Sequence, residues 1–345
     1  MRPLLLPLSF VYGAGVVIRN WFFDLGLLRS GAVNVPVISV GNLSAGGAGK
    51  TPLVELLAKR LTQRGKKVAI ISRGYKRKSR GTVVVSNGLT KCAEASESGD
   101  EPAQMASKLT GVIVIVDEQR ERGALYAIRK FGAGMILLDD GFQHRYLRRD
   151  IDIVVLPVEE AVDPGWMLPG GNRREPVSSL RRATLIAISR CESADQFFDA
   201  RDAIRRWTDN KVIGLTTKAS SFRRASTGFS VDLAGLKGKS VVAFSGIGNP
   251  DAFEKTLRSL GLHLKRHAVF SDHHPYDASE LAEFEQAFRS SGADFLVTTE
   301  KDVARINTGD PDRTAFLGRV PLFYVEIEQS VIQEESVLNE IIDRL

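Results

Sequence analysis

Cysteine is scarce in this chain of 345 residues, where only Cys92 and Cys191 occur. Two cysteines at this separation match no metal-ligand spacing and argue against a framework of several disulfides. We therefore expect two reduced thiols rather than a small disulfide-stapled fold. The hydrophobic content of 43% and the charged content of 26% are ordinary for a globular protein. The length suggests about two domains.

A long apolar run is also missing. The uncharged stretch from Pro3 to Ile18 is shorter than the ~20 residues of a membrane-spanning helix, and it contains two prolines. It ends in no convincing signal-peptidase site. The aromatic residues that begin at Trp21, beside Arg19, are typical of a segment in a membrane interface. We expect residues 1–30 to attach to the cytoplasmic face of a membrane; a buried core helix and a true membrane span are the alternatives.

Positive charge exceeds negative charge, with a formal net charge of +6 and a pI near 9.3. This balance favours an anionic partner, such as a phosphorylated substrate, an anionic lipid or a nucleic acid. No nucleic-acid module is recognisable, so we do not expect nucleic acid; nor does any pattern indicate an obligate protein partner. Although charge clusters are usually solvated, Arg73 and Arg174 lie in basic segments and could bind a phosphate through their planar forks.

A glycine-rich turn separates an apolar stretch, Val35 to Val40, from a helical pattern that runs from Pro52 to Leu61. Strand, turn and helix in this order form the context of a phosphate-binding P-loop. Backbone N–H groups of the turn and the positive end of the helix dipole can surround a polyphosphate. The residues of the turn are Ser44, Ala45, Gly46, Gly47, Ala48, Gly49, Lys50 and Thr51.

The last two residues of this turn have separate roles. Lys50 would reach the β- and γ-phosphates, and the Thr51 hydroxyl would bind Mg²⁺. One position departs from the usual pattern, because Ser44 stands where a glycine normally opens the loop. The Gly46–Gly47 pair can supply the missing backbone freedom nearby. The turn therefore predicts an ATP or GTP site.

Apolar segments alternate with helical patterns through the first half of the chain, which predicts an α/β fold with a P-loop NTPase-like, doubly wound parallel sheet. Pro157 marks a plausible boundary. We expect a nucleotide-binding domain at 31–156 and a second, smaller α/β domain at 157–304. The expected strands are 67–71, 82–85, 112–116, 135–139, 151–156, 184–189, 212–216, 240–245 and 294–298.

Acidic residues follow two of these segments. Asp139 and Asp140 end a strand in the manner of a Walker B motif, in which an acid holds Mg²⁺ directly or through water. A helix cap is the alternative role for such an acid. Asp100 and Glu101 precede a helix that we expect to begin near Pro102. Spacing alone does not choose between capping and a general base or Mg²⁺-proximal acid there.

Two further polar groups lie in the second half. Asp272 is followed by His273 and His274, which could be a metal site, a proton relay or a surface turn. A metal site would need a second ligand cluster, and none is evident. Glu300 and Lys301 stand at a strand-to-helix junction, where they could contact a base or ribose or cap the helix.

Taken together, these segments resemble the tetraacyldisaccharide 4'-kinase family, the lipid A 4'-kinases of Gram-negative bacteria. The resemblance spans nearly the whole chain and keeps the family's motif order. In that family too the phosphate loop opens Ser-x-Gly-Gly. One loop departs: Gly171-Asn-Arg-Arg-Glu175 replaces the frequent Gly-Pro-Leu-Arg-Glu. The matching segments are 40–52, 72–75, 99–102, 139–144, 168–176, 270–273 and 299–302.

This resemblance implies a reaction and a fold. The γ-phosphoryl of ATP would pass to the 4'-hydroxyl of tetraacyldisaccharide 1-phosphate and give lipid IVA. The family fold has two α/β/α units joined by a two-stranded linker, with the active site in the cleft. The C-terminal segment, about 305–345, would return to the first unit. The rival is a P-loop switch ATPase, which leaves Asp100, His273 and Arg174 without a role.

The resemblance also implies individual roles. Asp100 would be the catalytic base, paired with His273. Catalysis would further use Lys50, Asp139 and Arg174. The remaining assignments are Thr51, Glu101, Asp139 and Glu175 near Mg²⁺, Arg73 and Asn42 at the substrate, and Glu300 and Lys301 near the nucleotide.

Overall fold

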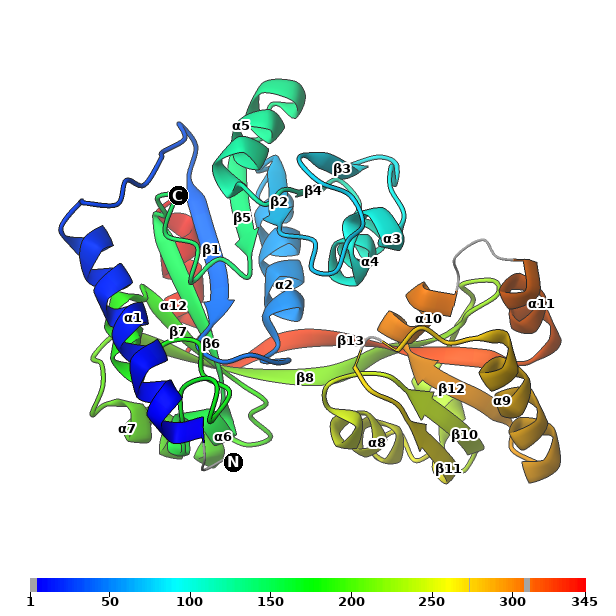
Figure 1. The fold of residues 1–345 in the computed structure, drawn as a ribbon. Coiled ribbons are helices and arrows are strands. Elements are labelled where there is room, and N and C mark those ends of the chain that lie inside the picture. Colours follow the sequence, from blue (N-terminus) through cyan, green and yellow to red (C-terminus); the bar gives the residue numbers. More distant parts are fainter. Residues whose placement is uncertain (1–4, 273, 307–310) are drawn as a thin grey trace. The chain divides into compact units, whose positions relative to one another are not determined.

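The computed structural model describes residues 5–272, 274–306 and 311–345. Contacts divide the chain into two compact units, each formed from separate stretches of sequence (Figure 1). Unit 1 consists of Met1–Ala93, Met105–Thr217 and Gln329–Leu345, and unit 2 of Glu94–Gln104 and Lys218–Glu328. The chain therefore passes between the units four times, at residues 93/94, 104/105, 217/218 and 328/329.

Unit 1 is built on a mostly parallel sheet with the strand order β8-β7-β6-β1-β5-β2-β4-β3. Strand β3 runs antiparallel to its neighbour β4. The strands read as continuous runs of apolar residues because helices cover both faces of the sheet. Their bounds are β1 Val37–Asn42, β2 Val68–Ser72, β3 Val83–Asn87, β4 Ile113–Val116, β5 Met135–Asp139, β6 Ile151–Pro157, β7 Leu185–Ser189 and β8 Lys211–Arg224.

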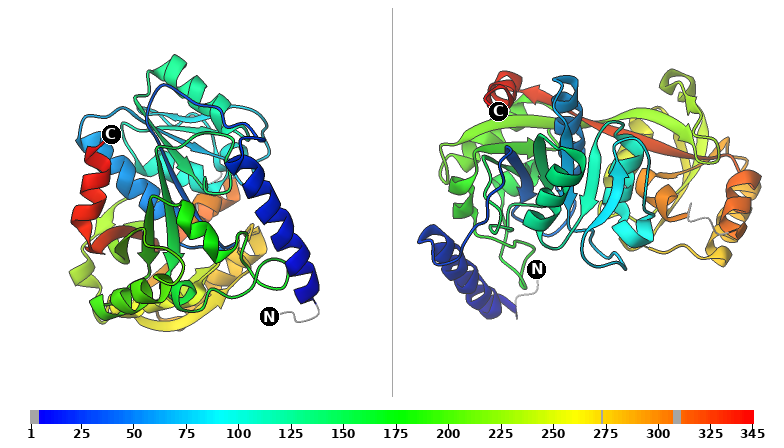
Figure 2. Two further views of the ribbon diagram at one scale, coloured as in Figure 1. Left: turned by 90° about the vertical axis from the view of Figure 1, so that its left-hand side faces the viewer. Right: turned by 90° about the horizontal axis from the view of Figure 1, so that it is seen from above.

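Alternate residues of each strand enter different cores. In β5, Met135 and Leu137 join the cluster that contains α2 and α12, whereas Ile136 and Leu138 join the cluster that contains α5. The terminal helices α1 and α12 lie on opposite sides of the strands (Figure 2). The helices of unit 1 are α1 Leu6–Asp24, α2 Lys50–Gln63, α5 Arg120–Phe131, α6 Val158–Val162, α7 Ala194–Ile204 and α12 Glu335–Asp343, with a 3-10 helix at Val177–Arg182.

Strand pairing places the P-loop beside the acids that follow β5. Strand β1 lies between β5 and β6, and Val40 pairs with Asp139 in parallel register. Because the carboxyl ends of parallel strands meet at one edge, the loop after β1 and the acids after β5 emerge together. Ligands of open α/β sheets bind at this edge.

Unit 2 has a smaller sheet with the order β11-β10-β12-β13-β8, and the short β9 pairs with β8. Two apolar clusters, one on each face, form its core. Its strands are β9 Ser230–Val231, β10 Ser240–Ser245, β11 His263–Val269, β12 Phe295–Thr299 and β13 Leu322–Gln333. Its helices are α3 Ala95–Ser98, α8 Pro250–Ser259, α9 Ala278–Ser291, α10 Glu300–Ile306 and α11 Pro311–Arg319, with a 3-10 helix at Leu233–Leu236; α4, Asp100–Lys108, starts in unit 2.

The division of the chain differs from the boundary expected at Pro157. Strand β7 continues the first sheet beside β6, and β8 pairs with β7, so residues 158–217 belong to unit 1. The C-terminal return to unit 1 begins at Gln329 rather than near residue 305. Apolar strand patterns are alike on both sides of Pro157, and only pairing assigns them to a sheet.

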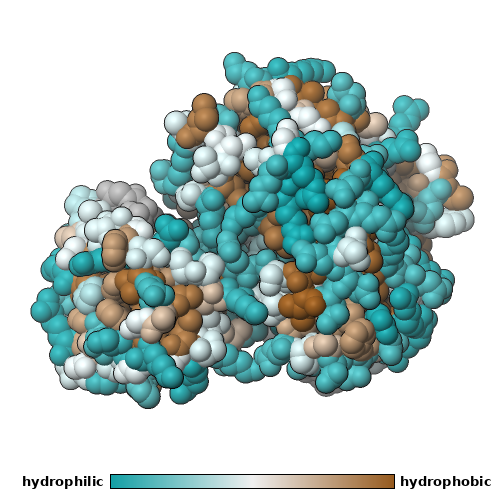
Figure 3. Space-filling view, turned by 180° about the vertical axis from the view of Figure 1, so that it is seen from behind, coloured by the Kyte–Doolittle hydropathy of each residue, from teal (hydrophilic) through white to brown (hydrophobic). Residues whose placement is uncertain are grey.

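The surface seen in Figure 3 is mostly hydrophilic, with hydrophobic side chains in separate groups. Helix α1 differs, because many of its large apolar side chains are exposed. These include Leu8, Phe10, Val11, Val17, Ile18 and Trp21. Within the described residues, no helix has the length and apolarity to cross a bilayer.

A close backbone contact in β1 yields a stability prediction. A Cβ built on Gly41 would lie 2.5 Å from the backbone nitrogen of Phe142. We expect Gly41→Ala to lower the free energy of unfolding by about 2 kcal/mol, because backbone must shift to admit the methyl group. Urea denaturation measures this change. The control Gly235→Ala meets no atom within 4 Å, and an equal loss in both variants would contradict the contact.

Candidate active site

The P-loop joins β1 to α2 over residues 43–49. Its glycines adopt conformations that L-residues rarely take, with φ of 133° at Gly46 and 91° at Gly49. Ser44, at the position where glycine is usual, donates a hydrogen bond from its hydroxyl to Glu160 Oε1 at 2.8 Å. The loop thus opens into the N-terminus of a 14-residue helix. Such a helix end binds anions through its unpaired N–H groups and its dipole.

Lys50 extends from the first turn of α2 toward two oxygens. Its Nζ lies 3.2 Å from Asn42 Oδ1 and 3.4 Å from Asp140 Oδ1. The Nδ2 atom of Asn42 is buried and has no hydrogen-bond partner among the described residues. A buried donor without a partner is costly. An anionic ligand beside Lys50 would satisfy it, so this residue set fits a phosphate.

The two acids after β5 have different surroundings. Asp139 is buried, and its carboxylate accepts a hydrogen bond from Ser72 Oγ at 3.0 Å. Asp140 has a positive φ of 51° and lies between Lys50 and Arg174, whose Nη1 is 3.0 Å from Oδ2. Burial alone would raise the pKa of Asp140, but these two cations outweigh it and hold the pKa below its usual range. Asp140 is therefore a carboxylate at neutral pH.

The glycine-rich loop that carries Arg174 is joined to the P-loop by backbone hydrogen bonds. Ser44 and Arg173 form an isolated antiparallel bridge. The Ala45 N–H donates to the Asn172 carbonyl at 2.7 Å, and the Arg174 N–H donates to the Leu43 carbonyl at 2.7 Å. The guanidinium of Arg174 is therefore held beside Asp140 through the backbone as well as through its ion pair.

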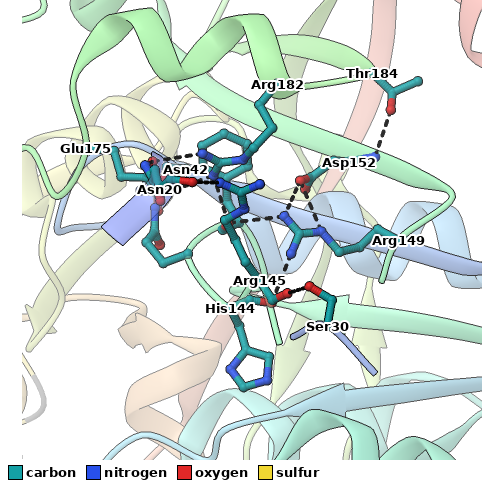
Figure 4. A network of polar contacts seen from close by, with 12 residues as sticks. Asn20, Ser30, Asn42, His144, Arg145, Arg149, Asp152, Glu175, Arg182 and Thr184 are labelled. Atoms are coloured by element: carbon teal, nitrogen blue, oxygen red, sulfur yellow. Dashed lines mark hydrogen bonds and ion pairs between the residues drawn. The ribbon is translucent and has the colours of Figure 1, made fainter. Parts of the chain in front are cut away.

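Glu175 is buried and its carboxylate is already bound by other side chains. Arg182 Nη1 lies 3.0 Å from Oε2, and Asn20 Nδ2 donates to the same oxygen at 2.9 Å (Figure 4). Burial would raise the pKa of Glu175, but Arg182 and Asn20 outweigh it and lower the pKa below its ordinary value. The structure thus places this expected Mg²⁺ neighbour in a contact with α1 and Arg182.

Positive charge gathers on the other side of Asp139 and Asp140. Arg120 is buried, and its Nε has no hydrogen-bond partner among the described residues. Burial, together with the charges of Arg120 and other arginines, lowers the pKa of His144 to about 4. His144 is therefore neutral at pH 7. Arg73 is exposed, and its charge also acts on Arg120 and His144.

Thr51, in the first turn of α2, is buried. Four more of the expected site residues, Asp100, Glu101, Glu300 and Lys301, lie in unit 2, where α4 faces α10. Helix α4 begins at Asp100, two residues earlier than expected. Arg305 Nε donates to Asp100 Oδ2 at 2.8 Å, and Arg305 Nη1 lies 2.9 Å from the buried Asp302. Two more pairs join the helices at 2.8 and 2.9 Å; they are Lys301–Glu101 and Gln104–Glu300. His273, the expected partner of Asp100, lies outside the described residues.

Comparison with known proteins identifies the family. The model of the family described as Tetraacyldisaccharide-1-P 4'-kinase matches residues 1–345. The chain belongs to the tetraacyldisaccharide-1-P 4'-kinase family. It is therefore a kinase of lipid A biosynthesis, and the activity predicted from the resemblance is confirmed.

Individual relatives agree with this family over the whole chain. The tetraacyldisaccharide 4'-kinase of Chlorobium limicola is 34% identical, covering 100% of this chain and 98% of its own. That of Anaeromyxobacter sp. is 38% identical, with 99% and 91% covered. The crystal structure of LpxK from Aquifex aeolicus, solved in complex with ATP, superposes with a TM-score of 0.80 at 34% identity, with 99% and 98% covered. The predicted α/β fold is confirmed.

The described residues of this kinase form no metal site by themselves. No three or more His, Cys, Asp or Glu side chains gather among them where they could hold an ion. This is compatible with Mg²⁺, which proteins usually bind through one or two carboxylates together with substrate phosphates and water.

Sequence reasoning assigned no role to Arg305, Arg120 or Asn20. Arg305 lies five residues after Glu300 in the segment that drew attention, but its contact with Asp100 joins positions 205 residues apart. Arg120 and Asn20 lie outside the family motifs on which the prediction depended. The signal that could have identified these residues is a polar side chain at a position where the pattern of apolar residues predicts burial.

The Arg305 pair yields a second stability prediction. We expect Arg305→Ala to lower the free energy of unfolding by about 3 kcal/mol, because it leaves Asp302 buried without this partner. Urea denaturation measures the loss, with the exposed Arg289 as control, whose pair with Glu285 is worth less than ~1 kcal/mol. Similar losses in Arg305→Ala and Arg289→Ala would contradict this account.

Proposed function

We propose that this kinase transfers the γ-phosphoryl group of ATP to the 4'-hydroxyl of tetraacyldisaccharide 1-phosphate. The observation that carries the proposal is the convergence of Lys50 and Arg174 on Asp140, beside the unpartnered Nδ2 of Asn42. Two cations and a buried donor suit a transferring phosphoryl group, whose charge is spread over its three equatorial oxygens in the transition state. The relative from Aquifex aeolicus, whose structure holds ATP, supports the choice of nucleotide.

The P-loop supplies the nucleotide site in this proposal. Backbone N–H groups of residues 44–49 and the N-terminus of α2 bind the phosphates, and Lys50 contacts the β- and γ-phosphates. Glu300 and Lys301 are assigned to the rest of the nucleotide, as the family resemblance implies. This arrangement positions the reactants and neutralises charge, which is most of what phosphoryl transfer requires.

Thr51 and Asp139 are the residues we assign to Mg²⁺, which when bound neutralises charge on the β- and γ-phosphates. Thr51 follows the P-loop lysine, and Asp139 ends the strand next to β1. Glu101 and Glu175 are already bound to Lys301 and to Arg182 with Asn20. We therefore expect Glu101 and Glu175 to contact Mg²⁺ through water, or to bind it only after leaving their present side-chain partners.

Asp100 is the residue we assign as catalytic base, with His273 as its partner. The carboxylate accepts a charge-assisted hydrogen bond from Arg305, which fixes one of its oxygens. Asp100 would accept the proton of the 4'-hydroxyl as the phosphoryl group is transferred. In a loose transition state the base chiefly orients the alcohol. Arg73 and Asn42 are assigned to the acceptor.

Helix α1 is the segment we assign to the membrane. An acylated acceptor is held in a bilayer, so an enzyme that acts on it must work at the interface. Exposed apolar side chains on α1 and the excess of positive charge both suit such a surface. We propose that α1 lies in the interface at the cytoplasmic face of the inner membrane.

Loss of Asp100 tests the reaction and the base together. We expect wild-type enzyme to transfer label from ATP to tetraacyldisaccharide 1-phosphate in detergent micelles. Asp100→Ala should lower kcat by about 10² or more while ATP still binds. The exposed Asp251→Ala is the matched control. Steady ATP hydrolysis without transfer, in wild type and Asp100→Ala alike, would instead support a switch ATPase.

Removal of residues 1–28 tests the role of α1. We expect activity on the lipid acceptor to fall far more than affinity for ATP, because the P-loop is left intact. Kinetics in mixed micelles and ATP titration measure the two quantities. An equal loss of both would mean that α1 is part of the folded core and not an interfacial segment.

A further inference from the structure

The inward face of α1 makes polar contacts that attachment to a membrane does not require. Ser9 and Asn20 are buried, although α1 exposes large apolar residues elsewhere. Four of its side chains contact the two loops that hold the reacting groups. The contacts are Ser9 Oγ from the Gly170 N–H at 2.9 Å, Tyr12 Oη to the Arg174 carbonyl at 3.2 Å, Arg19 Nη2 to the Gln143 carbonyl at 2.8 Å and Asn20 Nδ2 to Glu175 Oε2 at 2.9 Å.

The Asn20 contact is the most direct of the four. It ends on the carboxylate of Glu175, the residue next to Arg174 (Figure 4). Arg182 binds the same carboxylate, so Glu175 is held from two sides. Because the Arg174 guanidinium binds Asp140, a shift of Glu175 would move the cation that faces the reacting phosphate. The partner of Asn20, Glu175, is thus the chain neighbour of a residue assigned to catalysis.

A second series of contacts leads from α1 to the P-loop lysine. Arg19 donates to the backbone carbonyl of Gln143, and Gln143 Nε2 donates to the Asn42 carbonyl at 2.8 Å. The Asn42 side chain in turn binds Lys50. Both cations that converge on Asp140 are therefore connected to the inward face of α1 through buried or half-buried polar groups.

The surroundings of Asn20 show that it serves Glu175. Arg145 Nη1 donates to the backbone carbonyl of Asn20 at 2.9 Å, which fixes this turn of α1. The side-chain Oδ1 of Asn20 is buried and has no hydrogen-bond partner among the described residues. Burying this oxygen without a hydrogen bond costs free energy, whereas the nitrogen of the same amide binds a carboxylate. An apolar residue would avoid that cost if packing were the only demand.

We propose that Asn20 is a positioning residue for phosphoryl transfer, through which the packing of α1 against the rest of unit 1 sets the arrangement of Glu175 and Arg174. The proposal rests on the function proposed above. In it, α1 has two separable faces: the outward face binds the membrane, and the inward face positions the glycine-rich loop that carries Arg174. An enzyme that lacks these contacts of α1 would still bind ATP but would transfer the phosphoryl group more slowly.

Two neighbouring substitutions separate these faces. Asn20→Ala should lower kcat on the acceptor about tenfold, because misplacement of a reacting group costs rate. The KM for ATP, partition into anionic phospholipid vesicles and the melting temperature should change little. Asn20→Asp, which has nearly the same shape but cannot donate, should lose at least as much. Trp21→Ala, on the outward face, should weaken vesicle partition and raise the acceptor KM, with a much smaller effect on kcat.

A double-mutant cycle tests whether Asn20 acts through Glu175. In a Glu175→Gln background, Asn20→Ala should have little further effect on kcat, whereas independent residues would multiply their losses. The inference would be overturned if Asn20→Ala kept full kcat. It would also be overturned if the fall in kcat came with a clearly lower melting temperature, which would indicate a general loss of stability. Arg174→Ala separates the two levels of the argument. If it retains kcat, the proposed role of this loop fails; if it loses kcat and Asn20→Ala does not, only the inference fails.

Discussion

The ionised carboxylate of Asp140 is the group on which the arrangement of unit 1 depends. It draws Lys50 from the P-loop and Arg174 from the glycine-rich loop to one point, at the edge of the sheet where β1 and β5 end. The Asp140 carboxylate remains charged despite its partial burial, because Lys50 and Arg174 lie on either side of it. Its negative charge in turn offsets the repulsion between these two cations. A positive φ at Asp140 is the local backbone strain that this placement carries.

Backbone hydrogen bonds then make the arrangement rigid. The glycine-rich loop pairs with the start of the P-loop as a short antiparallel bridge, so the two loops are joined through their backbones. The carboxylate of Glu175, in the same glycine-rich loop, binds Arg182 and Asn20 of α1. Such preorganised charge is the chief contribution a protein makes to phosphoryl transfer, because the chemical change at phosphorus needs little covalent help.

Features encoded locally were predictable from the sequence, and features made by distant pairing were not. The P-loop and the acids after β5 follow apolar strands directly, so strand, turn and helix could be read in order. Strand β11 was missed because it is an edge strand with charged and histidine residues. Strand β13 was missed although its apolar start, Leu322 to Val325, is typical of a strand. The domain boundary expected at Pro157 differs from the observed division because the strand patterns on its two sides are alike, and only strand pairing assigns them to a sheet. The roles of Asp100 and His273 stay predictions, since sequence spacing carries no information on what a side chain faces.

The separation of Asp100 and Arg305 by 205 positions has a consequence for the synthesis of the chain. Asp100 belongs to unit 2 although the stretches on either side of residues 94–104 belong to unit 1. A ribosome therefore releases the P-loop, the acids after β5 and Arg174 long before Arg305, whose guanidinium binds Asp100. Unit 1, which holds the P-loop, is itself completed only by residues 329–345, because α12 joins the core that contains α2. Neither unit can therefore complete its internal contacts until nearly the whole polypeptide has been made.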